Sequence, residues 1–76
     1  MTKSPKRLLV CVDNTEYAVS LERRKIYVAI ADAHAESHGQ VRVIDESGEH
    51  YLYPKKAFFQ VTLPQSVRRA VLDAAQ

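Results

Sequence analysis

The apolar residues of this chain are gathered in short segments, each ended by a polar turn or a proline. The longest continuous apolar stretches, residues 8–12 and 26–31, fall well short of the roughly 18 residues that a membrane-spanning helix needs. Segments this short suit the strands of a small sheet. With 76 residues, the chain can form one domain, and its core must be thin.

Five of these segments have the pattern of β-strands: residues 8–12, 26–31, 41–44, 50–53 and 59–63. Residues 26–31 give the clearest alternation, with one apolar side chain facing each side of the strand in turn. Residues 46–49 form a polar turn in which Gly48 can take a positive φ, so residues 40–53 read as a β-hairpin.

Three helical segments are predicted, two between strands and one after the last strand. Residues 32–38 have Asp32 as a candidate N-cap and Gly39 as a candidate stop, which predicts one or two helical turns. Residues 55–57 follow Pro54 and suit a single 3₁₀ turn. The last segment is an amphipathic helix behind a proline, whose apolar face repeats at i, i+3, i+4 and i+7: Val67, Ala70, Val71 and Ala74.

These elements predict a mainly β fold, a five-stranded SH3-like barrel with a short C-terminal α-helix. We expect residues 1–6 to be a disordered N-terminal tail and residues 7–63 to form the barrel. Residues 64–75 should be the helix packed on that barrel.

The order of the elements resembles that of an SH3 domain. Residues 19–30 are similar to the family's diverging turn and second strand, and residues 51–59 are similar to its fourth strand, proline, 3₁₀ turn and start of strand five. Residues 13–21 then take the place of the long RT loop. The chain contains no Trp, so it lacks the central ridge with which signalling SH3 domains grip proline-rich helices. The resemblance therefore implies a fold rather than a ligand.

A second resemblance is carried by residues 42–49 and continues through residues 51–54. This stretch is similar to a group of short uncharacterised bacterial proteins. The similarity implies a bacterial origin and supplies no activity. The single cysteine and the short apolar stretch behind the basic start favour a cytoplasmic protein without a signal peptide.

Catalytic and metal chemistry are disfavoured. Cys11 lies inside an apolar run, where a packed thiol is expected rather than a nucleophile. His34 and His38 would share one face of a helix, with Cys11 or His50 as the candidates to complete a metal site. A connection whose histidines point into water is the simpler interpretation. We therefore predict no enzyme, no cofactor, no metal and no small-molecule substrate.

Protein binding is the function that the sequence favours. If Leu52 were in the core, the two tyrosines beside it would lie outside, near the long loop, and exposed tyrosines are typical interface anchors. The alternative is that these tyrosines pack under the C-terminal helix or under residues 32–38. The candidate surface is made of aromatic residues with two charged neighbours: Tyr17, Tyr51, Tyr53, Phe58, Glu16 and Lys55.

Nucleic-acid binding is the alternative from another class. The net charge of +2 permits an acidic partner without demanding one. The basic residues that would contact phosphates lie in two groups: Arg23, Arg24 and Lys25, and Lys55 with Lys56. The opposing interpretation is that these side chains simply keep the surface soluble.

Overall fold

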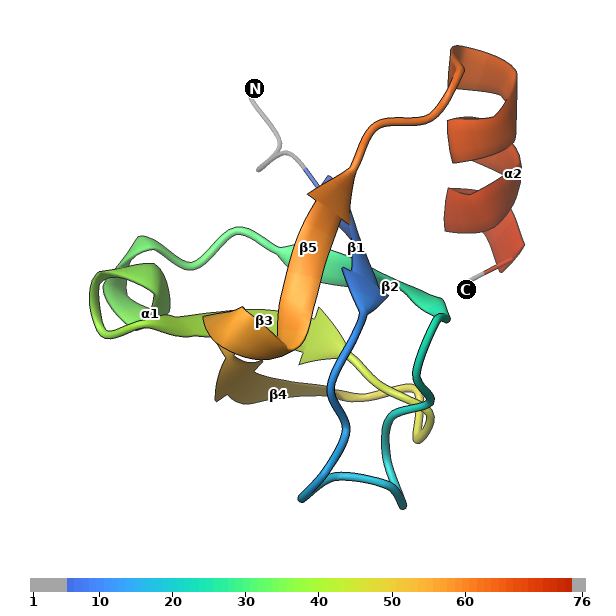
Figure 1. Ribbon diagram of the computed structural model, residues 1–76. Coiled ribbons are helices and arrows are strands. Elements are labelled where there is room, and N and C mark those ends of the chain that lie inside the picture. The colour runs from blue at the N-terminus through green and yellow to red at the C-terminus, as the bar shows by residue number, and fades with distance from the viewer. Residues whose placement is uncertain (1–5, 75–76) are drawn as a thin grey trace.

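The computed structural model, described here for residues 6–74, is an open antiparallel sheet with an α-helix at each of two corners (Figure 1). Its elements are β1 (Lys6–Cys11), β2 (Ile26–Ile30), α1 (Ala33–Ser37), β3 (Gln40–Ile44), β4 (His50–Pro54), the 3₁₀ turn η1 (Lys55–Ala57), β5 (Phe58–Val61) and α2 (Gln65–Ala74). The strands neighbour one another in the order β4-β3-β2-β1-β5.

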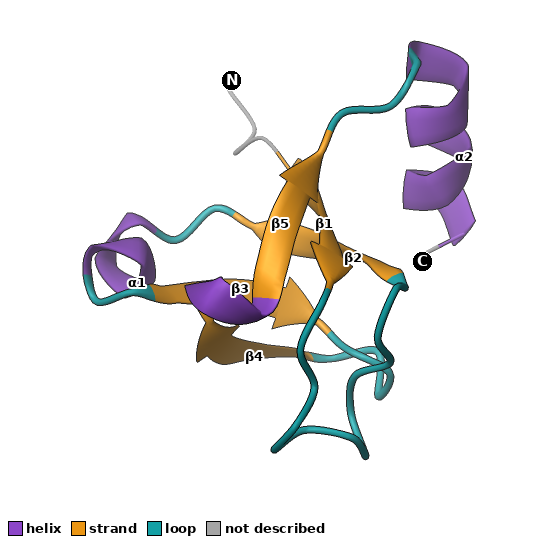
Figure 2. Ribbon diagram, viewed as in Figure 1, coloured by secondary structure: helices purple, strands orange, loops and turns teal. Residues whose placement is uncertain are grey.

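The predicted mainly β fold, with five strands and a C-terminal helix, is confirmed. The hydrogen-bonded ladder is open, because β4 and β5 are the two edges and no ladder joins them among the described residues. The sheet bends strongly, so that β1 and β5 run across the direction of β3 and β4 (Figure 2). This bend encloses one face of the sheet.

The enclosed face holds the main core. Alternation places Leu9 and Cys11 of β1 on this side together with Tyr27 and Ala29 of β2, and Leu9 is the direct partner of Tyr27. Further buried members come from the remaining strands, the loop after β1, and η1: Leu21, Val41, Val43, Tyr53, Ala57 and Phe58. The core therefore depends on contacts between segments far apart in the sequence.

The outer face of the sheet is also apolar near β1 and β2, where Leu8 is 1% exposed and Val28 is 3% exposed. Helix α2 stands beside the sheet, where the Arg68 guanidinium donates to the carbonyl of Lys6 at 2.8 Å, and its Val71 borders a hollow of about 320 Å³ together with Ile26 and Ile44. None of the described residues of α2 is fully buried. The predicted helix is present over Gln65–Ala74. Of its predicted apolar face, Val71 and Ala74 border the hollow, whereas Val67 is 45% exposed and Ala70 is also exposed.

Both ends of α1 follow the predicted signals. The Asp32 carboxylate accepts a hydrogen bond from the backbone N–H of Ala35 at 3.0 Å, and Gly39 ends the helix with φ of +74°. The predicted N-terminal tail included Lys6, but Lys6 is the first residue of β1. Residues 1–5 of that tail lie outside the described residues.

The docking of α2 gives a testable prediction. Val71→Asp should lower the free energy of unfolding by about 1–2 kcal/mol, because it places a charge against the outer apolar face. Ala70→Asp makes the same charge change on an exposed position of the same helix, and should stay within about 0.5 kcal/mol of the wild type. Urea unfolding of the three proteins measures both values. Equal effects would mean that α2 does not pack on the sheet.

Candidate protein-binding groove

The long loop between β1 and β2, residues 12–25, is held against η1 by backbone hydrogen bonds. The N–H of Val12 donates to the carbonyl of Ala57 at 2.8 Å, which ties the start of the loop to η1. The Asp13 carboxylate then accepts from the N–H of Thr15 at 3.0 Å and from its hydroxyl at 2.6 Å. This local turn directs the chain outward. The loop returns at Arg24, whose N–H donates to the carbonyl of Cys11 at 2.6 Å.

A groove of about 260 Å³ lies between this loop and η1. It is lined by Asp13, Thr15, Glu16, Tyr17, Pro54, Lys56 and Ala57. The half-buried Tyr17 ring meets the buried Tyr53 ring edge to face, with centroids 5.1 Å apart, an arrangement that aromatic pairs prefer. Tyr17 is therefore held in place while it still lines the groove.

The groove carries two carboxylates and one ammonium group, those of Asp13, Glu16 and Lys56. The hydrogen bonds from the side chain and backbone of Thr15 hold the pKa of Asp13 below its ordinary value. Asp13 is therefore ionised at neutral pH. The two carboxylates offer acceptors for a basic group, beside the ammonium of Lys56 and the nearby charge of Arg23.

The Tyr53 hydroxyl joins the core beneath the groove to the β3–β4 turn. It donates to the Asp45 carboxylate at 2.6 Å and lies 2.9 Å from the Ser20 hydroxyl. The other Asp45 oxygen accepts from the N–H and hydroxyl of Ser47, at 2.9 and 2.6 Å. Burial acts to raise the pKa of Asp45, which is 7% exposed, but the hydrogen bonds from Ser47 and Tyr53 outweigh it and the pKa lies below its ordinary value.

A second tyrosine, Tyr27, makes a similar hydrogen bond to Glu46, the residue that follows Asp45 in the turn. The Tyr27 hydroxyl donates to Glu46 at 2.5 Å and accepts from the N–H of Glu22 at 2.8 Å. Burial, with the Glu46 hydrogen bond next, raises the pKa of Tyr27. Lys25 also contacts Glu46, at 2.5 Å. Both tyrosines therefore anchor the long loop to the same hairpin turn.

The predicted protein-binding residues divide between groove, core and elsewhere. Glu16 and Tyr17 line the groove, whereas Tyr53 and Phe58 are 5% and 6% exposed and belong to the core. The prediction that Tyr51 and Tyr53 both lie outside required Leu52 to be in the core. Leu52 is instead 39% exposed. Tyr53 packs under Tyr17 rather than under either helix.

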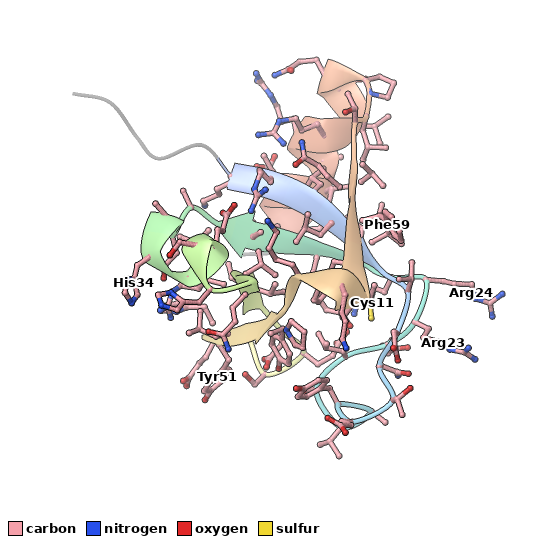
Figure 3. The ribbon with its side chains drawn as sticks, turned by 60° about the vertical axis from the view of Figure 1, so that its left-hand side comes forward. Cys11, Arg23, Arg24, His34, Tyr51 and Phe59 are labelled. Carbon is pink, nitrogen blue, oxygen red and sulfur yellow. The ribbon has the colours of Figure 1, made fainter. Side chains whose placement is uncertain are left out.

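The other two members of that set lie outside the groove. Tyr51 is 51% exposed, and its hydroxyl is 3.4 Å from Glu49. Lys55 borders a different hollow, beside Phe58. Figure 3 shows Tyr51 and Arg24 on opposite sides of the molecule.

The basic residues of the nucleic-acid hypothesis are also dispersed. Arg23 and Arg24 extend from the end of the loop (Figure 3), and Arg24 holds a positive φ of 70°. Lys25 is paired with Glu46. Lys55 and Lys56 border two different hollows on η1. The five side chains therefore do not line one common hollow, although the charges of Arg23 and Lys56 both lower the pKa of Asp13.

The predicted protein-binding set missed five groove residues, Asp13, Thr15, Pro54, Lys56 and Ala57, of which Lys56 belonged to the nucleic-acid alternative. In sequence, Asp13 and Thr15 follow the first apolar segment and Pro54 follows the fourth, which indicates only a local turn and a strand end. Their common position depends on the loop folding back onto η1. The available signal was the acidic charge beside Tyr17 in the segment that resembles an RT loop.

The buried hydrogen bond between Tyr53 and Asp45 gives a second prediction. At neutral pH, Tyr53→Phe should lower the free energy of unfolding by about 1–3 kcal/mol, since it removes a donor from a buried carboxylate. Tyr51→Phe removes an equivalent hydroxyl from an exposed ring and should cost less than about 0.5 kcal/mol. Urea unfolding of both variants gives the comparison.

The same bond predicts the acid behaviour. Since the pKa of Asp45 is lowered by folding, its contribution is present above its unfolded value of about 4 and is lost as pH falls through the folded value. The difference between wild type and Tyr53→Phe should therefore shrink below about pH 4. A difference that is constant from neutral to acid pH would contradict the charged hydrogen bond.

No protein-family model matches the chain. No curated protein and no solved structure matches it either.

Proposed function

We propose that this chain is a non-catalytic protein-binding module with an SH3-like barrel, and that its groove binds an extended segment of a partner protein. The observation that carries the proposal is the position of Tyr17. Its ring is supported from beneath by Tyr53 and lines a groove between the long loop and η1. A partly exposed, rigidly held tyrosine of this kind is the usual anchor of a binding surface.

Three features of the fold support the SH3-like part of the proposal. A long loop separates β1 from β2, η1 joins β4 to β5, and the sheet bends around a core. The loop occupies the place that the sequence resemblance gives to the RT loop. Closure of the bent sheet into a barrel would need only the approach of its two edges, which η1 already connects.

The chemistry of the groove suits a peptide. It is shallow, and its lining combines an aromatic ring and a proline with charged groups. An extended chain can place one apolar side chain on Tyr17 and a basic side chain near Asp13 and Glu16. The partner is therefore expected to carry an apolar residue close to a Lys or Arg.

The non-catalytic part is supported by the state of the one nucleophilic candidate. Cys11 is fully buried, and burial raises the pKa of its thiol. A thiol in that state resists the ionisation that nucleophilic catalysis requires. Its packing in the core also gives it a sufficient structural role.

The test is a pair of matched charge reversals. Peptides are first selected from a random display library on the wild-type protein, and their affinity is measured by fluorescence anisotropy. Glu16→Lys should weaken binding by roughly tenfold, because it reverses a charge at the groove. Glu49→Lys makes the same change at an exposed position in the hairpin turn, and binding should change less than about twofold.

Two outcomes would overturn the proposal. One is the failure of any peptide to be selected, or an equal loss in the two variants. The other is tight binding of a mixed single-stranded oligonucleotide that weakens steeply with salt and strengthens in both lysine variants, since counterion release has that signature. The second result would establish the nucleic-acid alternative.

A further inference from the structure

Two exposed histidines lie at the C-terminal end of α1, with His34 in the helix and His38 as its C-cap residue. His34 and His38 are four residues apart, and their ring centroids are 4.6 Å apart with a tilt of 51° between the planes. Both residues are exposed, and Figure 3 shows His34 at the edge of the molecule. The sequence alone favoured a connection whose histidines face water. The structure adds the proximity of the two rings and a defined hydrogen bond.

That hydrogen bond selects one tautomer of His38. Its Nδ1 lies 2.9 Å from the backbone carbonyl oxygen of His34 and 3.1 Å from the Ser37 hydroxyl. A carbonyl oxygen can only accept, so Nδ1 of a neutral His38 ring must carry the hydrogen in this contact. The Nε2 lone pair is then left free. Metal-binding histidines in proteins commonly use this arrangement, in which a carbonyl orients the ring and increases the basicity of the ligating nitrogen.

The frame that carries the two rings is held from both sides. The Arg7 guanidinium, from β1, lies 2.7 Å from Glu36 in the middle of α1. The Arg42 guanidinium, from β3, lies 2.8 Å from Asp32, which also caps the helix. A five-residue helix would be marginal on its own. These contacts hold it in the form that keeps the histidines together.

We propose that His34 and His38 form a two-histidine site for a divalent transition-metal ion of the zinc class. Imidazole nitrogens suit Zn²⁺, Ni²⁺ and Cu²⁺, and an i, i+4 pair on a helix can place both on one ion. No group of three or more His, Cys, Asp and Glu side chains is suitably placed among residues 6–74. Water therefore completes the coordination, which makes the site open and its ion exchangeable.

The experiment is a calorimetric titration of the full chain with Zn²⁺ at neutral pH. His34→Ala and His38→Ala should each weaken binding by at least about tenfold, because the second imidazole otherwise acts as an intramolecular ligand at high effective concentration. His50→Ala is the matched control, since Nδ1 of His50 lies 3.2 Å from the Arg42 guanidinium and belongs to a different contact. Its affinity should equal that of the wild type.

Thermal unfolding with and without Zn²⁺ supplies a second measurement that separates binding from a folding defect. The metal should raise the melting temperature of the wild type and His50→Ala, because binding to the folded state stabilises it. The same addition should leave the two single-histidine variants unchanged. Equal zinc affinity in all four proteins, or in the wild type and either of these variants, would overturn the two-histidine site.

Discussion

The hydrogen bond between Tyr53 and Asp45 links the core, the hairpin turn and the long loop. Its donor lies in the core beneath Tyr17, and its acceptor begins the β3–β4 turn. Ser20 of the long loop completes the group, and the carbonyl of that serine also accepts from the N–H of Glu46 at 3.1 Å. A buried carboxylate is costly unless its oxygens are satisfied. The position of the groove is therefore set by the need to satisfy Asp45.

The polar contacts compensate for a thin core. A chain this small buries a modest fraction of its surface, and here the inner face of the sheet must be closed by a loop rather than by a second layer. Leu21 of that loop is completely buried. The tyrosine hydroxyls on both sides of it hold the loop to the hairpin. The loop that closes the core therefore also forms one wall of the groove.

Local features of the fold could be predicted from sequence, and long-range ones could not. The cap at Asp32, the glycine stop and the strand end at Pro54 depend on neighbouring residues, and each was correctly predicted. The face of β4 that points into the core was not correctly predicted, because both faces carry apolar side chains. Tyr53 rather than Leu52 points inward, where Asp45 accepts a hydrogen bond from its hydroxyl. Of the groove, only Glu16 and Tyr17 were predicted, since its two walls are separated by three strands and a helix in sequence.

The connection between β4 and β5 has a consequence for how the protein behaves at high concentration. These strands are the two free edges of the sheet, and exposed edges invite pairing with strands of other molecules. Here, Pro54 removes a backbone donor at the end of β4, and η1 then carries the chain directly to the other edge. A foreign strand would find a five-residue edge that ends in a proline. The same turn that forms one wall of the groove thus limits the length over which a foreign strand can pair with β4.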